Sequence, residues 1–326
     1  MKRVLALLLA LPVHLLTLGF VALGAWLILG QPGSVLTWLL GGTSLAIGWA
    51  LRPRLGGLPA DAEVLDRSSA SELYGAAERV ADRVGVRRPR KVAVMDLAPG
   101  TRYDRMGLLR TPVLVIGLPL WLALPPRQRV ALLATAYARV PTGDELVVSG
   151  ALFTLEAWRD ALMGAEPLRV REEAQTKIAA SSLGAVDQPG TTYEVAGMFG
   201  RMFGRVLGGP VLLIQYALTR LARAGEGRTL ARQRKLARRA ASEQDLADLD
   251  ELAGGGYLAP IQAAALRGES VAAIRQGALA RSRLTDDGVL TTPPHSELLG
   301  AHESELVDEE LHAHYKRAIR GFGLIS

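Results

Sequence analysis

Two long apolar runs open the chain, and charged residues become frequent only after them. Between residues 4 and 29 the only polar side chains are His14 and Thr17, and a helix over this run is about 39 Å long, enough to cross a hydrocarbon core of about 30 Å. After a short turn, a second run without charge covers residues 35–51. We predict a transmembrane helical hairpin with these two spans. A cleaved signal peptide is the alternative for the first run, but its apolar core would be shorter and a small-x-small cleavage site should follow.

Basic residues flank both outer ends of the predicted hairpin. They are Lys2 and Arg3 before the first span, and Arg52 and Arg54 after the second. Because cytoplasmic flanks carry the excess of Lys and Arg, we expect both termini in the cytoplasm. The chain is then an integral protein of the cell membrane, with a hairpin domain at 1–55 and a cytoplasmic domain at 56–326.

Two features inside the hairpin predict how its helices pack. Gly42, Ala46 and Ala50 recur at every fourth position, a spacing that lets two helix backbones approach closely. His14 lies near mid-membrane, where it is either a proton or ligand site or a neutral imidazole that bonds to the neighbouring helix. We favour the hydrogen-bonded imidazole.

The remaining chain is predicted to be mostly α-helical with a small β-sheet, an α+β fold. Ser69 to Glu72 have the spacing of a capping box, and Gly85 ends the helix that follows. The other elements that the pattern predicts are strands at 91–95 and 111–117, which form a small sheet edge, and helices at 125–139, 145–163, 170–183 and 195–221. The last is apolar but interrupted by arginines, which indicates a segment at the membrane interface.

Composition narrows the chemistry further. The chain contains 0 cysteines, which excludes disulfides, thiolate zinc sites and cysteine nucleophiles. Its net charge is +6, and a basic helix lies at 228–239. No aromatic stacking platform accompanies this helix, so we expect it to face anionic lipid and not nucleic acid. Histidines near the C-terminus (His295, His302, His312 and His314) lie among acidic residues, and we interpret this region as a solvated acidic helix that could face a partner.

One order of motifs points to a family. After the hairpin and an amphipathic helix come Gly117-Leu118-Pro119-Leu120-Trp121, then Leu132-Leu133-Ala134, then Gly143-Asp144. This order resembles that of the HtpX-type and CAAX-prenyl-protease-like integral-membrane zinc metallopeptidases. The resemblance implies a cytoplasmic zincin-like domain. In the family, Leu-Leu-Ala is followed by His-Glu-x-x-His, and a later helix supplies a third zinc ligand before an Ala-Asp pair.

The functional positions of that motif are all changed here. Thr135 and Arg139 stand where the family has its two histidines, and Ala136 stands where it has the catalytic glutamate. Aligned on Ala247-Asp248, the third-ligand position is Gln244. Only two supporting acids of the family are retained, Asp144 and Asp248.

These substitutions remove the chemistry of hydrolysis. Alanine cannot deprotonate water, and arginine is a permanent cation that repels a divalent metal. Without zinc nothing lowers the pKa of water toward neutrality. We therefore expect no catalytic residue, no metal ligand and no cofactor, with Arg139 taking the place of zinc and pairing with Asp144 or Asp248.

The resemblance then implies a catalytically inactive, membrane-anchored peptidase homologue that acts by binding. Its expected partner is another membrane protein, such as an active peptidase paralogue, or a peptide held along the strand of Val113, Leu114, Val115 and Ile116. One alternative is an active zinc metalloendopeptidase with unusual ligands, among them Glu243 or Asp245, or with a site completed by a partner chain. Another is a basic, lipid-binding structural membrane protein.

Overall fold

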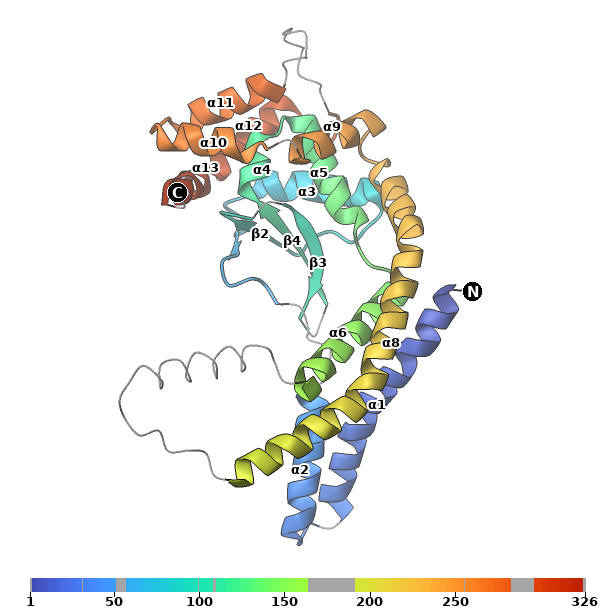
Figure 1. Cartoon of the computed structure of the whole chain (residues 1–326). Helices are drawn as coiled ribbons and strands as arrows, with labels where there is room; N and C mark the ends of the chain where they lie inside the picture. Colours follow the sequence, from blue (N-terminus) through green and yellow to red (C-terminus); the bar gives the residue numbers. More distant parts are fainter. Residues whose placement is uncertain are drawn as a thin grey trace, which may run out of the picture. The chain divides into compact units, whose positions relative to one another are not determined.

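The computed structural model describes residues 2–30, 32–50, 57–98, 100–107, 110–163, 191–254, 256–282 and 296–324 (Figure 1). It divides into two compact units, and each unit is made of two chain segments: Met1–Arg54 with Pro141–Gly227, and Leu55–Val140 with Arg228–Ser326. The sequence had indicated one boundary near residue 55, whereas the structure groups Pro141–Gly227 with the hairpin. The predictions that lie outside the described residues are the flanking Arg52 and Arg54, the helix at 170–183 and His295.

The first unit contains the predicted apolar helices. They are α1 (Lys2–Gly30), α2 (Val35–Ala50), α6 (Gly143–Met163) and the first part of α8 (Thr191–Ala237). Among the described residues, α1 is the one helix long and apolar enough to cross a membrane, whereas α2 is apolar but has only 16 residues. Most of the apolar surface of α1 is exposed; Leu8 and Leu18 are examples. By length and composition, then, α1 could span a bilayer.

The hairpin helices pack through a different set of small residues from the one predicted. A Cβ added to Gly24 would lie 2.7 Å from the carbonyl oxygen of Gly41, and one added to Gly48 would lie 2.6 Å from a methyl group of Val21. The Ser44 hydroxyl donates to the carbonyl of Phe20 at 2.8 Å. The prediction of a Gly42, Ala46 and Ala50 contact stripe was therefore wrong, since Gly42 and Ala46 are exposed. The apolar pattern did not indicate this contact face, because the face contains the polar residue Ser44.

His14 forms the hydrogen bond that we favoured, although with an unexpected helix. Its Nε2 atom lies 3.0 Å from the carbonyl oxygen of Val147, which belongs to α6 and not to the hairpin partner. Around this bond, the core of the unit joins Ala10 of α1, Leu155 of α6 and Leu218 of α8. Two segments that are distant in sequence thus cover α1.

The helix predicted at 195–221 and the basic helix after it are one continuous helix, α8, with 47 residues. On its described part, Val211 and Leu218 are buried, whereas Leu213 and Tyr216 are 72% and 64% exposed. An apolar exposed face beside Arg220 is compatible with the membrane interface. That placement remains a prediction.

The second unit is built on a four-stranded sheet. Its strands are β1 (Glu63–Val64), β2 (Lys91–Met95), β3 (Arg102–Met106) and β4 (Thr111–Gly117), and their order in the sheet is β1-β2-β4-β3. The pair β2–β4 is parallel and the other pairs are antiparallel. Strands β2 and β4 confirm the prediction.

The position of β4 in the sheet corrects a prediction. It hydrogen-bonds to β2 on one side and to β3 on the other, so it is an interior strand. Val113 to Ile116 therefore cannot pair with a peptide by strand addition, which needs an unpaired edge. The free edges of this sheet belong to β1 and β3.

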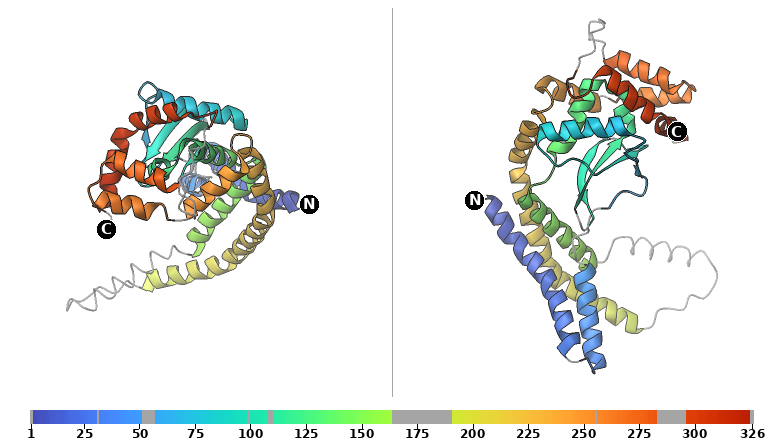
Figure 2. Two further views of the ribbon diagram at one scale, coloured as in Figure 1. Left: turned by 90° about the horizontal axis from the view of Figure 1, so that it is seen from above. Right: turned by 180° about the vertical axis from the view of Figure 1, so that it is seen from behind.

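Helices cover one face of the sheet. They are α3 (Ser71–Val84), α4 (Leu118–Ala123) and α5 (Pro126–Ala138), which lie together on that face in both orientations of Figures 1 and 2. The shared core contains Val94, Leu114 and Ile116 from the strands. The mixture of helices with a small sheet bears out the α+β class.

A distant acidic residue caps α3 in place of the predicted capping box. The N–H groups of Glu72 and Leu73 donate to the carboxylate of Glu310, at 2.9 Å and 3.0 Å. The end of α3 is as predicted, because Gly85 adopts the left-handed conformation with φ of 86°. The amphipathic helix was therefore predicted correctly, while its first turn depends on tertiary structure.

Helices from the end of the chain complete the second unit. They are α9 (Glu243–Gly254), α10 (Leu258–Leu266), α11 (Val271–Ser282), α12 (Ala301–Glu310) and α13 (His312–Leu324). The acidic residues of α12 are not simply solvated, as we had expected. Asp308 pairs with fully buried Arg129 at 2.5 Å and with Arg275 at 2.6 Å, and Glu303 pairs with Arg79 at 2.9 Å.

Candidate functional site

The two helices that carry the motif positions named in the sequence analysis, α5 and α9, pack against each other in the second unit. The contact is fixed at the start of α9, where Ser242 and Asp245 form a capping box. The Ser242 hydroxyl accepts from the N–H of Asp245 at 3.1 Å, and the Asp245 carboxylate accepts from the N–H of Ser242 at 2.9 Å. Arg127 of α5 forms an ion pair with Asp245 and donates to the Ser242 hydroxyl at 3.1 Å. This contact sets the register of α9 along α5.

A cavity of 330 Å³ lies among α5, the last turns of α8 and α9. We call it the α5–α9 cavity. Thr135 and Arg139 line it from α5, at the two positions that resemble the family's histidines. Ala136, at the position that resembles the catalytic glutamate, is buried and does not line it. One helical turn separates Thr135 from Arg139, so both can face the same space.

The third-ligand position was misplaced. The residues of α9 that line the cavity are Glu243, Leu246, Ala247 and Asp250, and Gln244 is not among them. Gln244 is exposed and donates to the carboxylate of Asp248 at 2.8 Å. The register of α9 depends on its capping contact with α5, which an alignment on Ala-Asp does not contain.

The predicted ion pair of Arg139 was also wrong. Arg139 is exposed, and within the described part of the chain its guanidinium makes no ion pair or side-chain hydrogen bond. Asp248 instead accepts the hydrogen bond from Gln244. Asp144 is exposed in the first turn of α6 and belongs to the first unit.

The donor set of the cavity does not fit zinc. Protein zinc sites use imidazole, thiolate or carboxylate ligands, usually four in a tetrahedron or three with an open position. Here Thr135 and Arg139 replace the two imidazoles, and Arg234 and Arg238 add two more cations. Two carboxylates, Glu243 and Asp250, are present, but no described group of three His, Asp or Glu residues is placed to hold a metal ion.

Tyr137 does not replace the general base that is missing at Ala136. Tyr137, beside Ala136 in sequence, donates its hydroxyl to the carbonyl of Ala77 at 2.9 Å. Burial raises the pKa of Tyr137 well above its usual value, so the phenol stays protonated at neutral pH. Its ring packs edge-on against Tyr103 of β3, with 4.9 Å between ring centroids. Tyr137 therefore joins α5 to α3 and to the sheet and does not act as a base.

The charges around the cavity are unbalanced. Arg238 and Glu243 both line the cavity and form an ion pair with each other, so the charge of Arg238 is neutralised. Arg139 and Arg234 remain, with Asp250 as the one other acid among the lining residues, so the lining carries an excess of one positive charge. Sequence reasoning missed Arg234 and Arg238 because it assigned the whole basic segment to lipid. Their spacing of four, with Ala237 between them, could have indicated a common face.

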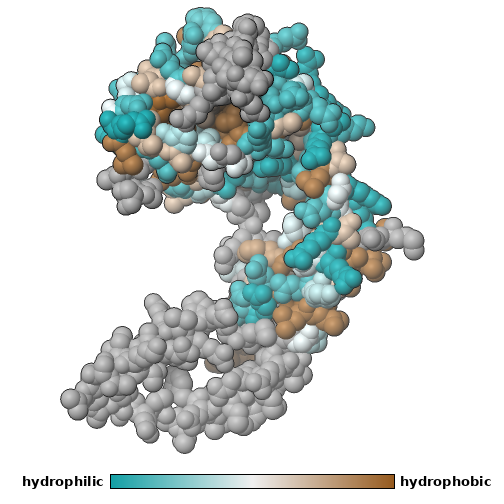
Figure 3. All heavy atoms as spheres, turned by 45° about the horizontal axis from the view of Figure 1, so that its top comes forward, coloured by the Kyte–Doolittle hydropathy of each residue, from teal (hydrophilic) through white to brown (hydrophobic). Residues whose placement is uncertain are grey.

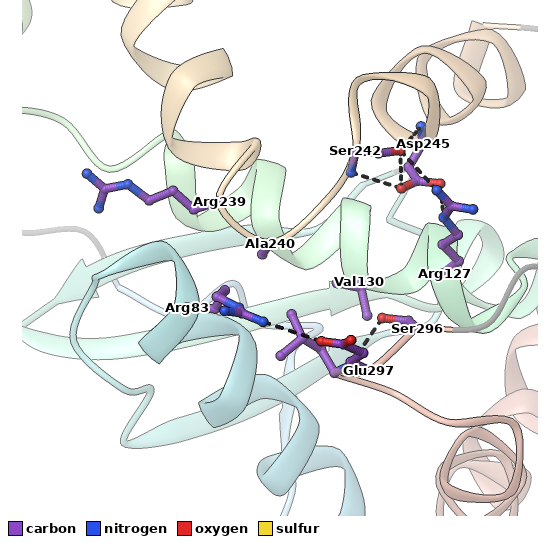
Figure 4. A pocket seen from close by; sticks show the side chains of 10 residues that line it. Arg83, Arg127, Val130, Arg239, Ala240, Ser242, Asp245, Ser296 and Glu297 are labelled. Carbon is purple, nitrogen blue, oxygen red and sulfur yellow. Dashed lines mark hydrogen bonds and ion pairs between the residues drawn. The ribbon is translucent and has the colours of Figure 1, made fainter.

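A second cavity, of 320 Å³, is lined in part by the residues of the capping contact, Arg127, Ser242 and Asp245 (Figure 4). Three arginines line it, but each has a partner: Arg127 pairs with Asp245, Arg83 with Glu297 at 3.6 Å, and Arg239 donates to the carbonyl of Val84 at 2.9 Å. Figure 4 shows that Arg239 points away from the other two. We interpret these arginines as structural links between helix ends.

Comparisons with known proteins add no relative. No family model, no curated protein and no solved structure matches this chain. The family resemblance therefore remains an expectation from the order of motifs in the sequence.

Proposed function

We propose that this chain is a membrane-anchored, catalytically inactive homologue of the zinc metallopeptidases that acts by binding and not by hydrolysis. The observation that carries the proposal is the α5–α9 cavity. It lies between the two helices that the resemblance pairs, and Thr135 and Arg139 face it from positions one turn apart. Thr135, Ala136 and Arg139 supply neither the imidazoles nor the glutamate that the family uses at the matching positions.

A peptide is the ligand that the sheet best supports. Strand β3 has a free edge, and Tyr103 ties this strand to Tyr137 of α5. An extended peptide can add to such an edge through main-chain hydrogen bonds. In this proposal β3 takes the role that the sequence gave to Val113–Ile116. The edge is short and carries exposed Arg102 and Asp104, so specificity would come from side-chain contacts beside it.

Anchoring follows from α1, whose exposed apolar surface needs lipid or another membrane protein as its neighbour. We propose that α1 and α2 cross the membrane as a hairpin with both termini in the cytoplasm. An accessory role beside an active peptidase paralogue is consistent with a peptide-binding unit on such an anchor.

A zinc-grafting experiment tests the geometric basis of the proposal. Thr135→His and Arg139→His, with Arg234→Ala to remove a repelling charge, are combined with Ala247→Glu as the third ligand. Because these positions line one cavity, this variant should retain near one zinc per chain after metal dialysis. The matched control places the glutamate at residue 244 (Gln244→Glu) and should retain far less, since that side chain does not face the cavity.

The outcomes separate the possibilities. Near one zinc per wild-type chain, with peptide hydrolysis that a chelator abolishes, would favour an active peptidase with unusual ligands over our proposal. Equal zinc in the Ala247→Glu and Gln244→Glu variants would show that α5 and α9 do not have zincin-like geometry. Elemental analysis provides the measurement in each case.

A lipid-binding structural role is the second candidate, because α8 carries exposed Leu213 and Tyr216 beside Arg220 and Arg223. Such a surface fits the interface of an anionic membrane. Salt-sensitive binding to anionic vesicles by a chain lacking residues 1–55, with no peptide binding by the intact chain, would favour this role.

A further inference from the structure

We propose that the α5–α9 cavity selects peptides that present a carboxylate, which the guanidinium groups of Arg139 and Arg234 bind. This inference rests on the proposed binding function and specifies the ligand. The carboxylate is either an acidic side chain or the C-terminus of the peptide, because both present the same group to an arginine.

Charge is the first argument. Once Arg238 and Glu243 neutralise each other, the lining keeps two cations and one anion, Arg139 and Arg234 against Asp250. In the part of the chain that the structure describes, neither Arg139 nor Arg234 forms a side-chain hydrogen bond or an ion pair. One carboxylate from a ligand would balance the excess and would accept the planar, paired N–H groups that guanidinium presents.

The shape of the cavity is the second argument. Its volume of 330 Å³ is at the lower end of the range of ligand pockets, about 300–1,000 Å³. Ala138 and Ala237 are buried and form apolar parts of its lining, with Leu246 beside them. The small apolar side chains of the lining suit the methylene groups of a glutamate-like group, and the two guanidinium groups suit its carboxylate.

A lipid headgroup is the competing ligand, since a phosphate also binds arginine. The cavity belongs to the second unit, whose face in Figure 3 is mainly hydrophilic with scattered hydrophobic residues. Most of the exposed large apolar side chains belong to α1, α2 and the part of α8 that lies in the first unit, and Leu230 is the one such residue among those that line the cavity. The observations therefore favour a peptide.

The test uses the full chain in zwitterionic nanodiscs and three alanine-rich octapeptides with a neutral coumarin label. The first has one internal glutamate and an amidated C-terminus, the second has glutamine in its place, and the third is the glutamine peptide with a free C-terminus. We expect at least one carboxylate peptide to bind roughly tenfold more tightly than the amidated glutamine peptide, the size of one charge-assisted hydrogen bond. The peptide that shows the preference identifies the source of the carboxylate.

Variants then locate the effect. The double variant Arg139→Gln with Arg234→Gln should lose the preference while still binding the amidated glutamine peptide. The control is Arg228→Gln, which removes one positive charge from an exposed arginine of α8 that does not line the cavity. It should keep the preference.

Several results would overturn the inference. They are equal binding of all three peptides, an equal loss of preference in Arg228→Gln, and a preference that survives the double variant. Competition by phosphatidylglycerol vesicles that depends on Arg139 and Arg234, without a peptide preference, would assign the cavity to a lipid headgroup instead. If none of the peptides binds, the proposed peptide-binding function fails as well, whereas binding without preference overturns only this inference.

Discussion

Asp308 is the counter-charge of two arginines, Arg129 and Arg275, in the interior of the second unit. Asp308→Asn should therefore be among the most destabilising single substitutions there. Arg129 is 0% exposed, stacks over Trp121 with 4.9 Å to the ring centroid, and donates to Asp308. Arg275 pairs with the other oxygen of Asp308. The pKa of Arg275 is lowered to about 10, mainly by burial and then by the charge of Arg129, while Asp308 opposes both effects. Without Asp308, two neighbouring cations would lie inside the protein with no counter-charge.

The magnitude follows from the cost of breaking a buried ion pair by removing one partner, about 3–5 kcal/mol. For a unit of this size, each kcal/mol lowers Tm by about 2–4 °C, so Asp308→Asn should lower Tm by about 10 °C. Arg129→Met is the matched comparison, because it leaves the Asp308–Arg275 pair intact and removes one of the two like charges. Its cost should be clearly smaller.

Thermal unfolding in detergent, followed by circular dichroism, measures both variants. Hydrogen exchange in α12 provides a local readout, since Ser304 and Asp308 of that helix both bind Arg129. The reasoning is refuted if Asp308→Asn unfolds within about 2 °C of the wild type, the smallest shift expected from one kcal/mol. It is also refuted if Arg129→Met lowers Tm more than Asp308→Asn does.

Three further predictions concern other contacts. Glu310→Gln should cost about 1 kcal/mol, the usual value of a helix cap, and should increase hydrogen exchange in the first turn of α3; unchanged exchange would contradict the cap. Gly41→Val should destabilise the hairpin in thermal unfolding while Gly42→Val should not, because only Gly41 contacts the facing helix; equal effects would show that the helices pack otherwise. Tyr137 has a raised pKa in the folded chain, so the unfolded state ionises first and stability falls as the pH rises above about 10; Tyr137→Phe should flatten that decline, and an unchanged pH profile would contradict the assignment.

The local sequence pattern predicted those elements whose buried residues form a single apolar run or a single helical face. Strands β2 and β4 appear as short apolar runs, and the helical face of α3 ends at Gly85. Strand β3 was missed because only Tyr103 and Met106 are buried among charged residues, a pattern without strict alternation. We predicted β4 to lie at an edge of the sheet. The order of the strands depends on pairing between segments distant in sequence, and only the identification of both neighbours, β2 and β3, places β4 in the interior.

The candidate site divides in the same way. The spacing of Thr135 and Arg139 along α5 placed both on one cavity, as helical geometry requires. The α9 residue facing them was misassigned, because the Ser242–Asp245–Arg127 contact that sets the register joins parts of the chain more than 100 residues apart. The inward pairing of Asp308 and Glu310 was missed for that reason too, since acidity alone predicts a solvated helix.

The second unit consists of two chain segments, one before and one after residues 141–227, and this has a consequence for biosynthesis. The first turn of α3 and the guanidinium of Arg129 obtain their partners from residues 304–310, in α12. A ribosome must therefore synthesise the chain through α12, including the 141–227 insertion, before the earlier segment of the unit can fold completely. Until then Arg129 lacks its counter-charge, Asp308, in the partly folded sheet and helices. Truncation upstream of α12 should therefore produce a chain that chaperones or proteases retain.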